Sequence, residues 1–254
     1  MCTAVILRRP GHSWPILVSA NRDEMLDRPT LGPARHWPDR ANVVAGQDQL
    51  AGGTWLGLND EGVVSGVMNR RGSLGPIDGV RSRGELVLEA LDHADARDAA
   101  EALSHLDARA YRAFNLFVAD NRDAYWLKGL GREGPAAVQS FELPHGLSMM
   151  TAYDRNDTSS ARIGAYLPRF ERAAAPDPEA GDWAAWQALL ASREVEGDGG
   201  EDGAMTIVTD RGFGTVSSSL IAVPAAGLAR KRPIWLYAAG RPDRMRYEPV
   251  KLAG

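Results

Sequence analysis

Residues 1–8 read MCTAVILR and residues 16–24 read ILVSANRDE, and these two stretches decide how the rest of the chain is interpreted. Each contains a short apolar run, and Pro10 and Gly11 lie between the two runs. This pattern predicts two strands, residues 5–7 and 16–20, joined by a turn. In an antiparallel hairpin the end of the second strand lies beside the start of the first. We therefore expect the polar residues 21–24 to lie next to residue 2.

Cys2 is the only cysteine among the 254 residues. Cysteine is small enough for methionine aminopeptidase to remove Met1, which would leave Cys2 with a free α-amine. A nucleophile and a general base would then belong to one residue, as in N-terminal-nucleophile (Ntn) catalysis. An α-amine titrates near pH ~7.7–8.0 and a free thiol near ~8.5, so both are usable at cellular pH. The alternative interpretation is a small buried residue at the start of a strand, where free cysteines are common.

The hairpin would bring Arg22 and Asp23 to Cys2. A cationic Arg22 would favour the thiolate, and Asp23 could accept a hydrogen bond from an ammonium group or orient the arginine. The alternative is that four polar residues close a strand in a turn. We assign Cys2, Arg22 and Asp23 to catalysis and the flanking Asn21 and Glu24 to binding.

The rest of the chain predicts an α+β fold, organised as a single domain over residues 1–254. Further strands are expected within 52–59 and 63–68, and at 114–119, 124–127, 138–143, 205–209, 215–223 and 234–237. Helices are expected from a capping box at Ser82 and Glu85, from Asp95, over 160–174 with a kink or break at Pro168, and after Asp182. Residues 27–42 and 194–203 are expected to be loops. Hairpins followed by helices favour antiparallel sheets covered by helical layers over a doubly wound fold.

Composition excludes several classes of function. The chain is 44% hydrophobic and 24% charged, which is typical of a soluble globular protein. One cysteine cannot form an internal disulfide or a cysteine-based zinc site, and no other metal motif is present. The net charge of −4 does not favour nucleic acid as a partner. The apolar run at residues 4–7 is too short for a signal peptide and no window could span a membrane, so we expect a cytoplasmic protein.

Five motifs in order make the chain resemble a known family. They are the Met-Cys-Thr start, NRDE at 21–24, GTWLG at 53–57, SRGEL at 82–86 and FNL at 114–116. They resemble the NRDE family, also called the transport-and-Golgi-organisation-2 family, most firmly over residues 1–130. The resemblance implies a four-layer αββα Ntn-hydrolase-like fold with two stacked antiparallel sheets.

The choloylglycine and penicillin V amide hydrolases, relatives by fold, cleave non-peptide amide (C–N) bonds. By that resemblance Cys2 is nucleophile and base, Arg22 and Asp23 tune it, and Asn69 contributes to the oxyanion hole. A turn residue is the alternative for Asn69. Two departures from the family pattern remove polar groups from the expected site. Met149 stands where many family members have an asparagine, and Val216 where many have an arginine.

The family is also linked to haem trafficking and to acyl-CoA or related lipids. The alternative function is therefore a non-catalytic carrier of haem or an acyl-CoA-like ligand, using the same pocket. Trp55 and Met149 are assigned to binding in either case. No cofactor is required, and haem is a ligand of the carrier alone. The candidate haem ligands are Cys2, His12, His145, Met149 and Met150, none of which lies in a haem-attachment motif. In both hypotheses the partner is a small molecule, either an amide, haem or an acyl-CoA-like compound.

Overall fold

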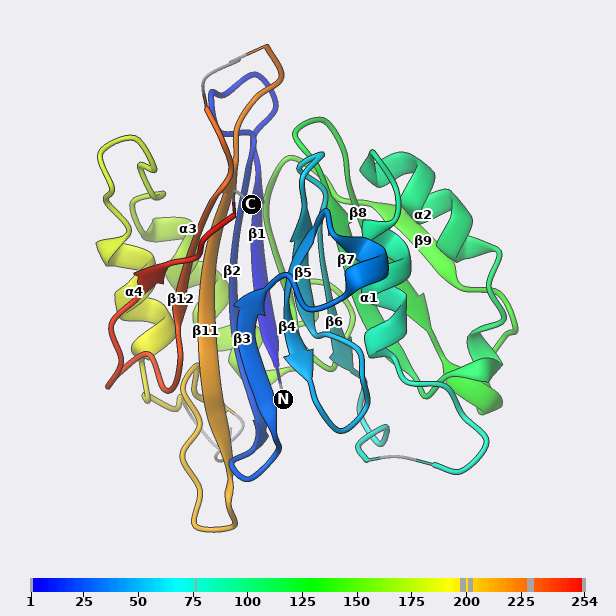
Figure 1. Ribbon diagram of the computed structural model, residues 1–254. Helices are drawn as coiled ribbons and strands as arrows, with labels where there is room; N and C mark the ends of the chain where they lie inside the picture. Colours follow the sequence, from blue (N-terminus) through cyan, green and yellow to red (C-terminus); the bar gives the residue numbers. More distant parts are fainter. Residues whose placement is uncertain (1, 76, 197–199, 201–202, 228–230, 253–254) are drawn as a thin grey trace. The chain divides into compact units, whose positions relative to one another are not determined.

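The computed structural model describes residues 2–75, 77–196, 200, 203–227 and 231–252 (Figure 1). The chain forms two compact units, one from residues 1–27 and 144–250, the other from residues 28–143 and 251–254. Each unit holds one antiparallel sheet. That the whole chain acts as a single domain stays a prediction.

The sheet of the first unit has the strand order β10-β1-β2-β11-β12-β13. Its strands are β1 (Thr3–Arg8), β2 (Ile16–Met25), β10 (Gly146–Met150), β11 (Phe213–Val223), β12 (Ile234–Ala238) and β13 (Glu248–Pro249). The predicted hairpin is confirmed, because β1 and β2 pair antiparallel with Thr3 opposite Asn21. β11 then pairs with the other edge of β2 along its whole length.

Helices α3 (Ala161–Arg172) and α4 (Ala184–Ala191) supply the core of the first unit. Their apolar side chains pack with Val5, Leu17 and Met149 of the sheet. The tryptophans at 183 and 186 are buried there, as their helical spacing predicts. Ser160 caps α3 by accepting a hydrogen bond from the Ile163 amide at 3.4 Å. No break occurs at Pro168, since α3 continues to Arg172.

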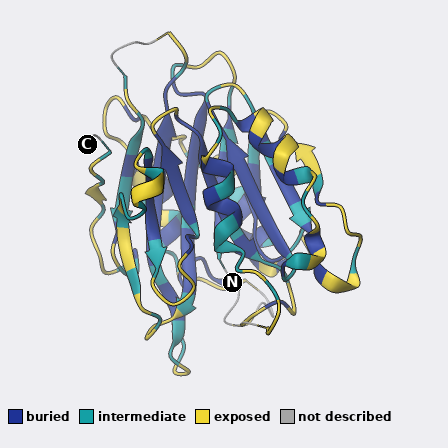
Figure 2. Cartoon of the chain, turned by 45° about the vertical axis from the view of Figure 1, so that its right-hand side comes forward, coloured by how far each residue is buried: buried dark blue, intermediate teal, exposed yellow. Residues whose placement is uncertain are grey.

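The sheet of the second unit runs β3-β4-β5-β6-β7-β8-β9. Its strands are β3 (Thr30–Ala34), β4 (Val43–Asp48), β5 (Leu56–Asn59), β6 (Val64–Asn69), β7 (Phe114–Ala119), β8 (Ala124–Gly129) and β9 (Gln139–Glu142). Helices α1 (Gly84–Leu91) and α2 (Ala96–Ser104) pack their apolar faces on it, with short 3₁₀ helices η1 (Pro38–Arg40), η2 (Ala108–Ala110) and η3 (Gly131–Glu133). In Figure 2 the central strands of this sheet are largely buried, while the edge strands β3 and β9 are partly exposed. Helix α2 has exposed residues on its outer face, and α1 has only buried and partly buried ones.

Several local predictions made from the sequence are wrong. The segment 205–209 is not a strand but an irregular stretch with one isolated bridge, from Val208 to Gly214, and its apolar Met205 and Ile207 are buried. β3 lies inside the expected loop 27–42, and β4, β10 and β13 were not expected. β3 contains Pro33, which an edge strand tolerates because its outward N–H groups need no partner. Part of the loop expected at 194–203 lies outside the described residues.

The two helix starts in the second unit behave differently. Asp95 caps α2, accepting a hydrogen bond from the Asp98 amide at 2.9 Å, as predicted. The capping box at Ser82 is wrong in detail. The Ser82 hydroxyl accepts from the Gly84 amide at 3.2 Å, and Arg83 occupies the N-cap position.

Two of the family-like motifs contact each other through their glycines. A Cβ atom at Gly53 would lie 2.6 Å from the carbonyl carbon of Gly84, and one at Gly84 would lie 2.9 Å from the Thr54 nitrogen. The Thr54 amide also donates a hydrogen bond to the Gly84 carbonyl oxygen at 3.2 Å. The GTWLG and SRGEL motifs therefore carry a close backbone contact at the start of α1.

Replacing Gly53 by alanine is expected to destabilise the protein by about 1–3 kcal/mol, because the new methyl group meets backbone that cannot rotate away. The matched control is Gly164→Ala within α3, where the nearest atom to the added Cβ is 3.4 Å away. That change is expected to stabilise by about 0.5–1 kcal/mol, since alanine favours helix. Urea unfolding of both variants measures the difference, and equal midpoints would contradict the contact.

Candidate active site

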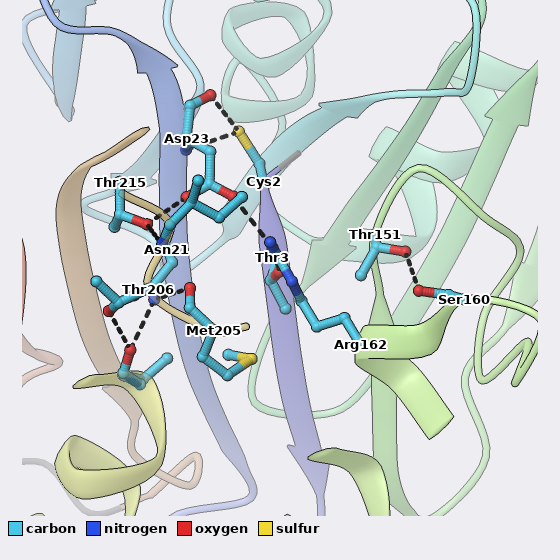
Figure 3. A network of polar contacts seen from close by, with 12 residues as sticks. Cys2, Thr3, Asn21, Asp23, Thr151, Ser160, Arg162, Met205, Thr206 and Thr215 are labelled. Carbon is cyan, nitrogen blue, oxygen red and sulfur yellow. Dashed lines mark hydrogen bonds and ion pairs between the residues drawn. The ribbon is translucent and has the colours of Figure 1, made fainter. Parts of the chain in front are cut away.

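Cys2 lies at the paired ends of β1 and β2 (Figure 3). The Asp23 amide donates a hydrogen bond to the Cys2 Sγ at 3.4 Å, and the thiol donates to the Asp23 carbonyl oxygen at 3.5 Å. The Cys2 residue itself is partly exposed. The hairpin thus brings the sulfur to the backbone of the expected acidic residue.

The surroundings keep the thiol protonated. Burial raises the pKa of the Cys2 thiol, and the negative charge of Asp23 raises it further. A hydrogen bond from the Asp23 backbone and the positive charge of Arg22 lower this pKa, but the net direction is upward. At neutral pH the sulfur therefore carries its proton, and attack on a carbonyl carbon would need a base to remove it.

A buried ion pair lies directly behind Cys2. The Arg162 Nη1 is 3.0 Å from the Asp23 Oδ2, and neither side chain is exposed to solvent (0% for each). The same nitrogen donates to the Thr3 Oγ1 at 2.6 Å, and the Thr215 hydroxyl donates to the Asp23 Oδ1 at 2.6 Å. Asp23 is thereby tied to β1, β11 and α3 (Figure 3).

Sequence reasoning missed Arg162. A signal was present, because residues 162, 166 and 170 follow helical spacing and Tyr166 and Phe170 are apolar core residues. An arginine on the buried face of a helix requires a buried acidic partner. That partner is 139 positions away in the chain, so spacing alone could not identify it.

Asn21 is engaged in protein hydrogen bonds. Its Nδ2 donates to the carbonyl oxygens of Leu190 at 3.0 Å and Met205 at 2.9 Å. Its Oδ1 accepts from the Ser218 hydroxyl at 2.6 Å. These bonds tie the last turn of α4 and the irregular segment at Met205 to β2, and the expected binding role of Asn21 stays a prediction.

Arg22 and Glu24 form a looser pair, with the Arg22 Nη2 3.9 Å from the Glu24 Oε2. The Arg22 side chain is 6% exposed and that of Glu24 29%. Arg22 lies opposite Ser217 of β11, and its charge lowers the pKa of Tyr237, which burial raises overall. The tuning of the thiol by Arg22 has the expected sign, and its catalytic role stays a prediction.

The two departures from the family pattern occupy different surroundings. Met149 pairs with Val5 and is fully buried in the core of the first unit. Val216 lies at a register shift of β11, between Thr215 and Ser217. A binding role for Met149 would require a ligand to reach that core.

The other expected site residues lie elsewhere. Asn69 and Trp55 belong to the second unit, where Asn69 ends β6 and the Trp55 ring covers Gly46. Their roles in catalysis and binding stay predictions. Of the candidate haem ligands, His12 and His145 are exposed, while Met150 is buried like Met149. Within the described ranges, no three or more His, Cys, Asp or Glu side chains are grouped to hold a metal ion.

The family model described as Transport and Golgi organisation 2 matches residues 1–164. The chain belongs to this family. The matched region contains Cys2, the NRDE tetrapeptide and Arg162.

The mouse Transport and Golgi organization 2 homolog is a relative by sequence. It is 32% identical over 117 residues, which are 43% of this chain and 40% of the mouse protein. The alignment thus spans less than half of either protein.

Solved structures show the fold class. The N-acylethanolamine-hydrolyzing acid amidase ortholog of Caenorhabditis elegans superimposes with a TM-score of 0.58 at 14% identity, covering 98% of this chain and 100% of that one. A mutant conjugated bile acid hydrolase from Clostridium perfringens gives 0.53 at 12%, covering 99% and 97%. Penicillin V acylase from Agrobacterium tumefaciens gives 0.50 at 13%, covering 94% and 83%. The chain has an α+β, Ntn-hydrolase-like fold, as expected, and these identities carry no further conclusion. No helix among the residues described is long and apolar enough to cross a membrane.

Proposed function

We propose that this member of the Transport and Golgi organisation 2 family is a cysteine Ntn-type hydrolase of a small non-peptide amide. One observation carries the proposal. The Cys2 sulfur is held between the amide and carbonyl groups of Asp23, whose carboxylate is fixed by a buried arginine. The solved proteins of similar fold are named an amidase, a bile acid hydrolase and an acylase, which supports the same reaction class.

The chemistry follows from the raised pKa of the thiol. Once Met1 is removed, the free α-amine of Cys2 accepts the thiol proton while the sulfur bonds to the amide carbonyl carbon. The carbonyl electron pair moves to oxygen, where hydrogen-bond donors stabilise the negative charge. The ammonium group then gives its proton to the nitrogen as the C–N bond breaks. A free amine leaves, and a thioester remains on Cys2.

Hydrolysis of the thioester completes the cycle. Water attacks the thioester carbon, the α-amine accepts a proton from it, and the C–S bond breaks to release a carboxylic acid. The proton returns to the sulfur and restores the thiol. Only water is consumed, and no step requires a cofactor.

Intact-mass measurement combined with an amide screen tests this function. We expect purified protein to lack the mass of one methionine residue, and to release amine from at least one member of a panel of N-acyl amides. A variant with an alanine inserted between Met1 and Cys2 is the matched control, since it retains the thiol but displaces the amine. Equal turnover by this variant, or retention of Met1 in an active preparation, would contradict the mechanism.

The carrier alternative, with haem or an acyl-CoA-like compound as ligand, has a separate readout. A carrier would show saturable binding and a rise in Tm with either ligand, in the absence of amide turnover.

A further inference from the structure

We propose that Arg162 is a positioning residue for the Cys2 nucleophile, acting through Asp23 and Thr3. The inference rests on the proposed function in one respect only, namely that Cys2 is the reacting group. Its evidence is the set of contacts behind the thiol (Figure 3).

One nitrogen of Arg162 joins the two strand ends that hold the sulfur. The Nη1 donates to the Thr3 Oγ1 at 2.6 Å and to the Asp23 Oδ2 at 3.0 Å. Thr3 follows Cys2 in β1, and the backbone of Asp23 in β2 provides both contacts to the sulfur. Arg162, which belongs to α3, therefore holds the ends of β1 and β2 together on either side of Cys2.

The far side of Asp23 is fixed as well. The Thr215 hydroxyl donates to Oδ1 and itself accepts a hydrogen bond from the Ile207 amide at 2.8 Å. The carboxylate thus has a defined orientation from both oxygens. Because the Asp23 side chain is held in place, its backbone is held too, including the amide and carbonyl groups that contact the Cys2 sulfur.

Charge gives Arg162 a second effect. Asp23 and Arg22 are the described side chains whose charges act on the thiol, and Asp23 opposes its ionisation. Arg162 lies 3.0 Å from the Asp23 carboxylate and offsets that negative charge.

Alkylation of Cys2 tests the proposal without requiring any turnover. Cys2 is the only thiol in the chain, so the loss of free thiol on treatment with iodoacetamide follows Cys2 alone. The second-order rate constant is measured from pH 6 to 10 for the native protein, Arg162→Lys and Arg162→Met. Thr206→Val is the matched control, because it removes a buried hydrogen bond to the Leu190 carbonyl oxygen at 2.8 Å but touches neither Asp23 nor Thr3.

We expect Arg162→Met to alkylate about tenfold more slowly at pH 8, with the rising limb of its profile displaced upward by about one pH unit. Arg162→Lys keeps the charge and is expected to regain most of the native rate. Thr206→Val should follow the native profile. A folded Arg162→Met with the native profile would overturn the proposal, as would an equal displacement in Thr206→Val.

A second variant covers the case in which Arg162→Met does not fold. Thr3→Val removes the hydroxyl that Arg162 contacts and leaves the ion pair intact. It is expected to slow alkylation about threefold without moving the pH limb, because ionisation is unchanged and only the placement of the sulfur is altered. A native rate in Thr3→Val would contradict the positioning role.

The outcomes separate the inference from the proposed function. Absence of amide turnover together with a displaced alkylation profile leaves the role of Arg162 standing and removes the hydrolase. Amide turnover together with an unchanged alkylation profile would support the hydrolase and overturn the role of Arg162.

Discussion

Replacing Cys2 by alanine is expected to reduce amide turnover by about a thousandfold or more, because covalent catalysis loses its nucleophile. Cys2→Ser should also be severely impaired, since a hydroxyl is far less acidic than a thiol and the α-amine would remove its proton less readily. Rates of amine release over a range of substrate concentrations measure the effect. We expect it in kcat, because the lost bond forms only during the reaction.

Ser19→Ala is the matched control for Cys2→Ala. Ser19 lies on β2 and is fully buried, and within the described part of the chain its hydroxyl has no hydrogen-bond partner. Removing that oxygen should change neither turnover nor folding stability appreciably. Native turnover in a folded Cys2→Ala protein would remove Cys2 from the mechanism.

Replacing Asp23 by asparagine is expected to lower the free energy of unfolding by about 3–5 kcal/mol, because it leaves the guanidinium of Arg162 buried without a counter-charge. The size of the loss follows from complete burial of both side chains. Urea unfolding at pH 7 measures it. The loss should be partly restored in Asp23→Asn combined with Arg162→Met, which removes both charges.

An exposed ion pair is the control for that experiment. Arg81 and Glu85 lie 2.8 Å apart at i,i+4 spacing, with side chains 50% and 39% exposed. Glu85→Gln is expected to cost less than about 1 kcal/mol, because water screens the pair. A similarly small cost for Asp23→Asn would show that the buried pair does not stabilise the fold.

Strand pairing near Cys2 was predictable because it is a local property. Residues 5–7 and 16–20 are apolar runs separated by a short turn, and antiparallel pairing of such runs determines which residues lie opposite each other. Local patterns likewise predicted the strands β7 and β8 and the cap of α2 at Asp95, and the structure confirms them. The strand predicted at 205–209 is wrong, because alternate apolar side chains can be buried without pairing with a neighbouring strand.

The candidate site was predictable only in part. The five motifs identified the family and the fold class, and the hairpin placed Cys2 beside residues 21–24. The hydrogen bonds of the polar side chains could not be predicted, because the three groups that the Asn21 side chain bonds, on Leu190, Met205 and Ser218, each lie more than 160 positions away. In the sequence, the motifs that contain Gly53 and Gly84 served only to identify the family. The structure shows why glycine is needed at both positions, because the two backbones are in close contact.

By itself, then, the sequence determined the fold class, the family and the proximity of Cys2 to Asp23, since these follow from local periodicity, strand register and ordered motifs. Only the tertiary structure decided that Asp23 is paired with Arg162, a contact between residues 139 positions apart. The physical reason is desolvation. A buried charge must find its counter-charge wherever packing places one, and packing between a strand and a distant helix is not encoded in any local pattern.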